Sequence, residues 1–406
     1  MRVHVRTLIV LTVIFWSLPP ASATAQTADD LFSLDTIHDL RLFINSRDLQ
    51  QLRQHFDENK YYAADLQWRN VRVRNVAVRS RGFGSRNATK LGLRVDMDRF
   101  TSRQRFVGLT ALVLDNLWHD PSLMRERLGM ALFRRMGHPA SRVAFARLYI
   151  NNTYQGLYGI VEPVDAQFVQ RTLGVTDGYL FQYRWLREYF GEYLGDDLAP
   201  YKQLFEPETQ RLAADTLLYS PIRDLFREVN HPDETVWRDT VDRYLDLDQF
   251  VSYVAIETCM SEGDGVAGWW GMANFFLYRP QRSTLHRLLT WDRDRAFDQI
   301  DSPIFARMDQ HILLQRALAF PDLRSRYLDV LDACARSAAE DGWLEQEVDR
   351  VAQLITGAVY QDVRKQFSND EFDAAVRYLR EFALQRPVFV ASEVAKARAA
   401  KLAGRD

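Results

Sequence analysis

The sequence predicts an α+β protein of two lobes, the first rich in strands and the second mainly helical. Up to about residue 163, apolar and polar residues alternate over short runs, which is typical of half-buried strands. From Val164 onward, apolar residues recur three and four positions apart, which is typical of amphipathic helices. A third observation is a predicted hairpin within the helical part, over about 264–298, whose ends carry acidic and amide side chains.

The composition is that of a globular protein large enough for two hydrophobic cores. The chain has 406 residues, of which 47% are hydrophobic and 26% are charged. A formal net charge of -2 gives no electrostatic basis for binding nucleic acid. Two cysteines are too few for a disulfide scaffold. Because Cys259 lies in an apolar helical run, we favour two buried free thiols over a bridge to Cys334.

Residues 1–25 are predicted to be a signal peptide that is not part of the fold. Arg2 and Arg6 give a basic start, residues 8–18 are apolar, and small residues over 21–25 offer a cleavage site. The apolar run is too short for a comfortable membrane span, although an uncleaved anchor is the alternative. No later segment approaches membrane length. We therefore expect a secreted or periplasmic protein of a bacterial-type cell, with no stable membrane span after cleavage.

The first lobe is expected over residues 30–163, and it begins with a short strand and a helix that has Ser46 as its N-cap. Alternating residues predict further strands over 71–78 and 93–97, and a basic loop with two glycines separates them. The backbone N–H groups of such a loop can approach a phosphate, with Lys90 or Arg94 supplying charge. The same Gly-x-Gly pattern also occurs in ordinary tight turns.

A helix and a hairpin complete the first lobe. Asp120 and Pro121 have the types expected at the N-cap and first position of a helix, which then ends at Gly137. Asp115 and His119, just before it, are interpreted as cap or turn residues. Residues 142–161 predict a β-hairpin that ends at Glu162, because the following proline stops strand pairing. We place the lobe boundary there, so that residues 164–406 form the second lobe.

Four oxygen-bearing side chains are predicted to meet at one end of the 264–298 hairpin. Asp264 lies in a loop after a helix, Asn274 precedes a strand, and Asp292 and Asp294 follow the next strand. Such oxygen ligands suit a hard cation such as Mg²⁺ or Mn²⁺. Two carboxylates about 4 Å apart repel by roughly 4 kcal/mol at an effective dielectric constant near 20, so a cation or an adjacent arginine must neutralise them. A solvated salt-bridge turn is the alternative interpretation.

The predicted order of elements is the layout of protein-kinase-like enzymes, with a hinge after the 142–161 hairpin and metal ligands in the helical lobe. The sequence has no His-Arg-Asp or Asp-Phe-Gly motif and no kinase-type glycine loop, so the predicted fold is an atypical protein-kinase-like one. Trp269 and Trp270, between the acidic loop and the strand, suit either a substrate platform or core packing over the hairpin. We favour core packing.

Several short stretches between about Ile37 and Phe297 resemble, in order and in combination, the spore coat protein H (CotH) kinase family. The stretches are Arg79-Ser80-Arg81-Gly82, Lys90-Leu91-Gly92-Leu93-Arg94-Val95, Leu112 to Asn116, Asp120-Pro121-Ser122-Leu123-Met124-Arg125, Leu148-Tyr149-Ile150-Asn151, Tyr154-Gln155-Gly156-Leu157-Tyr158, Asn274-Phe275-Phe276-Leu277-Tyr278 and Trp291-Asp292-Arg293-Asp294. The resemblance implies a secreted or surface-exposed atypical kinase.

The resemblance also implies roles for the residues of the hairpin. Asp264 matches the catalytic-loop aspartate that orients the acceptor hydroxyl. Asn274 and Asp292 match the metal ligands, and Asp294 is a second-metal or supporting residue.

In the first lobe, the resemblance makes Lys90 the phosphate contact, with Arg94 next. The family often has a second lysine where this chain has Leu91. Glu162 lies where the hairpin meets the hinge, so we expect it to line the nucleotide pocket.

The implied activity is transfer of the ATP γ-phosphate, with Mg²⁺ or Mn²⁺, to Ser, Thr or other hydroxyls of exported proteins. Two alternatives stay open: a kinase-fold coat or surface assembly protein with little activity, and a kinase-fold nucleotidyltransferase that binds ATP in a flipped pose. The helical segment after Phe305 is interpreted as packing of the second lobe.

Overall fold

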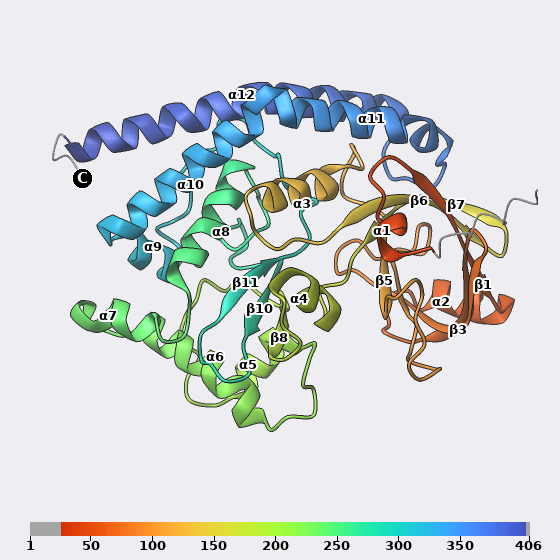
Figure 1. The fold of residues 1–406 in the computed structure, drawn as a ribbon, viewed down its shortest axis with the longest axis horizontal. Helices are drawn as coiled ribbons and strands as arrows, with labels where there is room; N and C mark the ends of the chain where they lie inside the picture. Colours follow the sequence, from red (N-terminus) through yellow and green to blue (C-terminus); the bar gives the residue numbers. More distant parts are fainter. Residues whose placement is uncertain (1–25, 403–406) are drawn as a thin grey trace, which may run out of the picture.

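In the computed structural model of this chain, residues 26–402 are described, and the predicted signal peptide lies outside them. The α+β prediction is confirmed. Strands dominate the first part of the described chain and helices the second, as Figure 1 shows. Among residues 26–402, no helix has the length and apolar character needed to cross a membrane.

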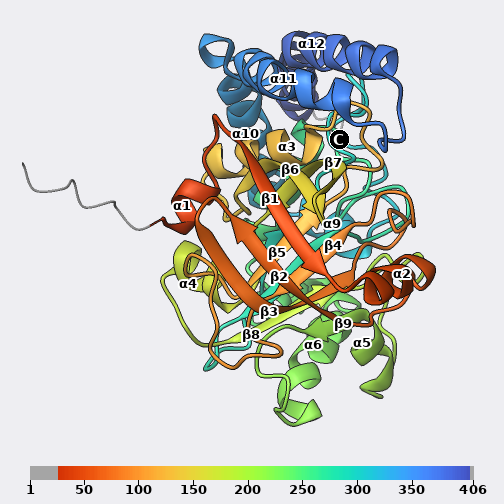
Figure 2. The same cartoon turned by 90° about the vertical axis from the view of Figure 1, so that its right-hand side faces the viewer.

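The first seven strands close into a barrel in the order β1-β2-β3-β4-β5-β7-β6. Their bounds are β1 (Ile37–Ile44), β2 (Tyr62–Trp68), β3 (Val71–Ser80), β4 (Leu93–Asp96), β5 (Ala111–Asp115), β6 (Val143–Ile150) and β7 (Thr153–Val161). Parallel pairing of β1 with β6 closes the barrel, and the other neighbours are antiparallel. Figure 2 views β1, β2 and β3 from outside the barrel. A hydrophobic core fills its interior.

Three helices accompany the barrel: α1 (Ala28–Leu31), α2 (Ser46–Gln54) and α3 (Arg125–Arg135). The N-cap of α2 is Asn45, one residue before the predicted cap. The predicted start of α3 is wrong by four residues. The Asp120 carboxylate does accept hydrogen bonds from the backbone N–H groups of Ser122, Met124 and Arg125. Leu123, however, has a φ of 55°, so the regular helix begins only after it.

The predicted hairpin over 264–298 is part of a larger sheet, which also holds two strands that the helical periodicity did not predict. Four antiparallel strands run in the order β11-β10-β8-β9. Their bounds are β8 (Tyr179–Tyr183), β9 (Phe205–Pro207), β10 (Phe275–Arg279) and β11 (Arg287–Thr290). Around it lie α4 (Ala166–Leu173), α5 (Ala199–Leu204), α6 (Asp215–Val229), α7 (Glu234–Val241) and α8 (Leu247–Cys259).

The last helices are α9 (Ile312–Leu318), α10 (Pro321–Ala339), the 3-10 turn η1 (Glu340–Gly342), α11 (Trp343–Gln361) and α12 (Asn369–Leu402). Figure 1 shows α11 and α12 running along one side of both the barrel and the helical part. Cys259 at the end of α8 forms a disulfide with Cys334 of α10, with their Cα atoms 6.4 Å apart. The prediction of two free thiols is therefore wrong, because packing of α8 on α10 brings the two cysteines together.

Candidate active site

A cleft of about 480 Å³ lies between the barrel and the second sheet. Asp264, Asn274, Asp292 and Asp294 all line it. Each follows or precedes a regular element, since Asp264 comes after α8, Asn274 immediately before β10, and the other two after β11. The structure thus brings together the four side chains that the sequence predicted to meet.

The backbone at this site is held in a conformation that few residues adopt. Asn274 and Asp292 have φ values of 55° and 53°, in the left-handed region that asparagine and aspartate tolerate better than most residues. The Asn274 side-chain amide donates to the Asp264 backbone oxygen at 2.9 Å and to its carboxylate at 3.0 Å. Positive φ at two adjacent loops is the kind of local strain that clusters at functional sites.

Arg293, between the two aspartates, is buried and ties the loops together. The Arg293 guanidinium donates to the Glu257 carboxylate of α8 and to the Asn274 backbone oxygen. The Arg293 backbone N–H donates to the Glu126 carboxylate of α3. Gly129 of α3 packs so closely that a Cβ there would lie 2.7 Å from the Cβ of Arg293. Arg293 therefore positions the Asp292–Asp294 turn from behind, and it does not face the cleft.

Carboxyl groups outnumber cations on this wall of the cleft. Burial, followed by the charge of Asp294, raises the pKa of Asp264 to about 6. Burial, followed by Asp294 and Glu126, raises the pKa of Asp292 well above its ordinary value. Burial also raises the pKa of Glu126 to about 8, with Asp115 and Asp294 adding to it. Each shift records a cost of holding negative charge, which a bound cation would remove.

The donor set fits a hard cation that takes part of its coordination from another molecule. Asp292 and Asn274 offer carboxylate and amide oxygens, and Asp294 lies beside them on the cleft wall. Among residues 26–402, no three His, Cys, Asp or Glu side chains form a metal-binding group by themselves. Mg²⁺ is usually held by one or two carboxylates together with substrate phosphates and water, so this set suits Mg²⁺ or Mn²⁺.

Lys90 is not among the residues that line the cleft. Its side chain is 1% exposed, and its Nζ lies 2.8 Å from the carboxylate of Asp362, which is itself 0% exposed. The Asp362 residue follows α11, in the C-terminal part of the chain. The prediction that Lys90 contacts the phosphates is therefore corrected, because its charge is already paired with Asp362 inside the protein.

Arginines line the barrel side of the cleft in place of Lys90. Arg94 of β4 does so as expected, with its Nε 2.8 Å from the Asp96 carboxylate. Arg81, which was not predicted, lies at the start of the two-glycine loop, 2.9 Å from Asp115 and 5.5 Å above the ring of Trp291. Its position directly before Gly82 was the sequence signal that could have identified it.

Two residues interpreted as cap or turn residues also face the cleft. The Asp115 carboxylate accepts from the Leu117 N–H at 2.7 Å, as a turn residue does, and it also pairs with Arg81. The Nδ1 atom of His119 lies 3.6 Å from the Asp294 carboxylate. Both therefore combine a local structural role with a place on the cleft wall.

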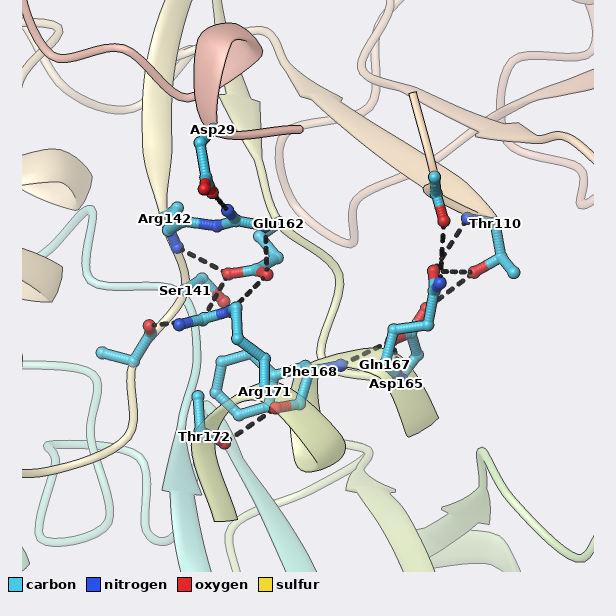
Figure 3. Close-up of polar contacts among 12 residues, drawn as sticks. Asp29, Thr110, Ser141, Arg142, Glu162, Asp165, Gln167, Phe168, Arg171 and Thr172 are labelled. Carbon is cyan, nitrogen blue, oxygen red and sulfur yellow. Dashed lines mark hydrogen bonds and ion pairs between the residues drawn. The ribbon is translucent and has the colours of Figure 1, made fainter. Parts of the chain in front are cut away.

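Glu162 does not line the cleft. Figure 3 shows Arg142 and Arg171 converging on its carboxylate, at 2.8 Å and 2.5 Å, with Asp29 paired to Arg142 at 2.6 Å. Glu162 is buried by these contacts and anchors the segment that connects β7 to α4. The next two residues, Pro163 and Val164, line the cleft instead. The expected pocket contact thus belongs to its neighbours.

The expectation of a buried tryptophan pair is wrong. Trp269 is 41% exposed and Trp270 is 42% exposed, and Trp270 lines the cleft beside Asp264. The flanking glycines, Gly268 and Gly271, pair across a tight turn that carries both rings at its tip. Glycine on both sides was the signal for a turn rather than for a core segment.

Comparison with known proteins gives one extended family match. The family model described as CotH kinase protein matches residues 78–390. The inner spore coat protein H of Bacillus subtilis (strain 168) is 20% identical over 366 residues, which cover 86% of this chain and 95% of that protein.

The chain also has a weak likeness to solved structures. A chain of the Shewanella oneidensis MR-1 toxin–antitoxin complex of HipA, HipB and operator DNA has a TM-score of 0.36 and 12% identity, over 72% of this chain and 61% of that one. The Helicobacter pylori proinflammatory kinase CtkA has a TM-score of 0.30 and 9% identity, over 76% of this chain and 95% of that one. Both TM-scores are below 0.5, so neither likeness assigns a function to the cleft.

Proposed function

The chain belongs to the CotH kinase protein family, and from this premise we propose that it is an exported atypical kinase. It transfers the γ-phosphoryl group of ATP, with Mg²⁺ or Mn²⁺, to Ser, Thr or other hydroxyls of exported proteins. The observation that carries the proposal is the cleft itself, which has an arginine-bearing wall opposite a wall of three aspartates and Asn274. Phosphoryl transfer needs such a pair of walls, one for the phosphates and one for the cation and acceptor.

The nucleotide lies across the cleft in this proposal. Four apolar side chains suited to a base line the cleft, and two of them belong to the connection between β7 and α4; the four are Val113, Pro163, Val164 and Phe276. Arg81 and Arg94 provide fixed positive charge for the phosphates, and a planar guanidinium can bind phosphate oxygens through two hydrogen bonds. The backbone N–H groups around Gly82 and Gly84 border the same space.

Asp292 and Asn274 hold the metal, with Asp294 as a further oxygen donor. When bound, the metal neutralises phosphate charge that develops during transfer. Asp264 accepts a hydrogen bond from the acceptor hydroxyl and aims its oxygen at the γ-phosphorus. A pKa of about 6 leaves this carboxylate mainly ionised at neutral pH, as the role requires. Asn274 fixes its orientation through the 3.0 Å hydrogen bond.

Two features support export. The relative in Bacillus subtilis is a spore coat protein by name, and the Cys259–Cys334 disulfide is of a kind that persists in oxidising compartments. The same relative also favours a second candidate function, assembly of a coat or surface layer with little catalysis. Nucleotidyl transfer from a reversed ATP is distinguished by which phosphate reaches the acceptor.

The test is thermal melting of the full protein with ATP and Mg²⁺, beside Asp292→Asn and Asp264→Asn. At a ligand concentration of 100 times Kd, binding adds about 2.7 kcal/mol, which raises the Tm by about 3 °C for a protein of this size. We expect a shift that requires the metal, is lost in Asp292→Asn and is kept in Asp264→Asn.

Labelled ATP then identifies the reaction. Label from the γ-position on the acceptor indicates a kinase, and label from the α-position indicates a nucleotidyltransferase. No melting shift in the wild-type protein would support the assembly function instead.

A further inference from the structure

Four aromatic side chains lie at the cleft or next to it: Phe83, Trp185 and Trp270 line it, and Trp269 belongs to the same turn as Trp270. We call this set, Phe83, Trp185, Trp269 and Trp270, the aromatic rim. Phe83 is 76% exposed, and its ring centre lies 5.8 Å from that of Trp185. The Trp185 indole N–H donates to the Trp270 backbone oxygen at 2.9 Å, and the Trp269 and Trp270 rings lie 5.9 Å apart. The rim thus runs from the two-glycine loop of the barrel to the loop that carries Asp264.

The Trp269–Trp270 turn is built rigidly onto the Asp264 loop. The Trp269 N–H donates to the Gly263 oxygen at 3.0 Å. A Cβ at Gly268 would lie 2.9 Å from that same oxygen, and one at Gly271, where φ is 81°, would lie 2.5 Å from the Tyr189 oxygen. Only glycine permits this approach, so the exposed rings are held at a fixed distance from Asp264.

The rim and the residues proposed to contact the base come from different segments of the cleft lining. Val113, Pro163 and Val164 are among the residues proposed for the base, whereas the turn of the two tryptophans is hydrogen-bonded to the Asp264 loop at Gly263. A molecule that presents a hydroxyl to Asp264 is therefore placed next to the rim. A contiguous exposed apolar surface beside a cleft is typical of a binding site.

A positive charge accompanies the rings. The Arg307 guanidinium lies 5.5 Å from the centre of the Trp269 ring. It donates a long hydrogen bond of 3.4 Å to the Ala267 oxygen, and the only nearby carboxylate that acts on its charge among residues 26–402 is that of Asp298, which is not within ion-pair distance. An arginine stacked on an aromatic ring keeps its edge available, which suits a carboxylate from a partner.

We propose that the aromatic rim is the docking surface for the acceptor. It takes a polypeptide segment whose hydroxyl residue is flanked by an aromatic side chain and, nearby, by an acidic residue. The rings of each rim pair are inclined by 65° and 80°, and this edge-to-face arrangement can be extended by a further aromatic ring. The acidic residue pairs with Arg307. The identity of Asp264 as the hydroxyl-orienting group rests on the proposed function; the docking itself does not.

The experiment uses fluorescent nine-residue peptides with a central serine. Neighbouring positions carry tyrosine or alanine, and glutamate or glutamine. Binding is measured by anisotropy with Mg²⁺ and a non-hydrolysable ATP analogue, and phosphorylation by kcat/KM. We expect the tyrosine peptide to be preferred over the alanine peptide about tenfold, which is about 1.4 kcal/mol. Trp270→Ala should reduce this ratio below about twofold and raise the acceptor KM while leaving the ATP KM unchanged.

Two further variants separate docking from folding. Trp343→Ala is the matched control, because that half-buried indole on α11 also stacks with an arginine, Arg135, at 4.7 Å, but does not line the cleft. It should keep the tyrosine preference. Arg307→Gln should keep the tyrosine preference and lose the glutamate preference. Melting curves confirm that each variant is folded.

Several outcomes would overturn the proposal. One is a tyrosine preference that survives Trp270→Ala, and another is an equal rise in the ATP KM. A wild-type protein that binds none of the peptides, or binds only a carbohydrate, also refutes it. Tryptophan-dependent peptide binding without any metal-dependent ATP stabilisation would support the docking surface and refute the proposed phosphoryl transfer.

Discussion

Replacing Asp362 with alanine should destabilise the protein by about 3–5 kcal/mol at pH 7. The substitution leaves Lys90 buried without its partner, and breaking one side of a buried ion pair typically costs this much. The pair is enclosed further by Gly156, where a Cβ would lie 2.5 Å from the Asp362 carboxylate. The carboxylate also accepts from the Leu157 N–H at 3.0 Å, so the substitution leaves a second buried group unsatisfied.

The cost of leaving the charge of Lys90 unpaired in Asp362→Ala, which we call the charge term, has an upper limit. Burial already lowers the pKa of Lys90, and without Asp362 the lysine can release its proton. For a lysine whose ordinary pKa is 10.5, this costs about 4.8 kcal/mol at pH 7, at about 1.4 kcal/mol per pH unit. The unfolded variant then binds one more proton than the folded variant, so its stability rises with pH. At pH 9 the charge term should fall to about 2 kcal/mol.

The assay is urea unfolding at pH 7 and pH 9, analysed as a double-mutant cycle with Lys90→Met. In the Lys90→Met background, Asp362→Ala should cost no more than about 1 kcal/mol, which gives a coupling of at least 2 kcal/mol by the same reasoning. Asp215→Ala is the control, since its pair with Lys202 is 2.6 Å long but about half exposed, and its loss should cost less than about 1 kcal/mol. A cost that matches the control, or that does not change with pH, would refute this reasoning.

Three other perturbations follow from the fold. Reducing the Cys259–Cys334 disulfide, which closes a loop of 75 residues, should destabilise the protein by about 4.5 kcal/mol; calorimetry with and without dithiothreitol measures this, and an unchanged Tm would contradict it. Burial lowers the pKa of His311 to about 4. The neutral imidazole therefore contributes fully to the free energy of unfolding above pH 6.5, and this contribution is lost as the pH falls toward 4. His311→Asn keeps a side-chain cap for α9 but does not titrate. Between pH 7 and pH 4 its free energy of unfolding, measured by urea titration, should rise by about 3 kcal/mol relative to that of the wild type; a difference that does not change with pH would refute the shift. Arg386→Met should cost at least about 3 kcal/mol in urea unfolding, because four backbone carbonyls lose a buried donor; a cost below about 1 kcal/mol would show that water replaces the guanidinium.

Local pattern was sufficient where the interacting residues are close in sequence. The 142–161 hairpin appears with a turn at Asn151 and Asn152, whose positive φ values suit a tight hairpin. Asp264, Asn274 and Asp292 meet because a helix end and one antiparallel hairpin separate them, and hairpin geometry is short-range. The strand β8 was missed because it is short and largely buried on both faces, so its sequence has no apolar–polar alternation to distinguish it from a helix.

Local sequence patterns could not predict contacts between residues that are far apart in the chain. Lys90 is paired with a residue 272 positions later, and nothing in the loop around it indicates that a C-terminal turn will cover it. The two cysteines are 75 positions apart, and their pairing depends on how α8 packs on α10. The place of Glu162, where the hairpin meets the predicted hinge, suggested that it lines the nucleotide pocket, yet Arg142 and Arg171 pair with its carboxylate. In each case tertiary packing, which the local sequence does not encode, decided the partner.

The buried guanidinium of Arg386 on α12 has a consequence for the time at which the cleft is completed during synthesis. It donates to backbone oxygens of Thr258 and Cys259, just before the Asp264 loop, and of Ile300 and Ser302, beyond Asp294. A ribosome adding 5–20 residues per second reaches position 386 roughly 6–25 seconds after position 264. A nascent chain therefore carries both acidic loops for some seconds before their support exists. If the chain crosses a membrane unfolded, the cleft first takes its final shape on the far side.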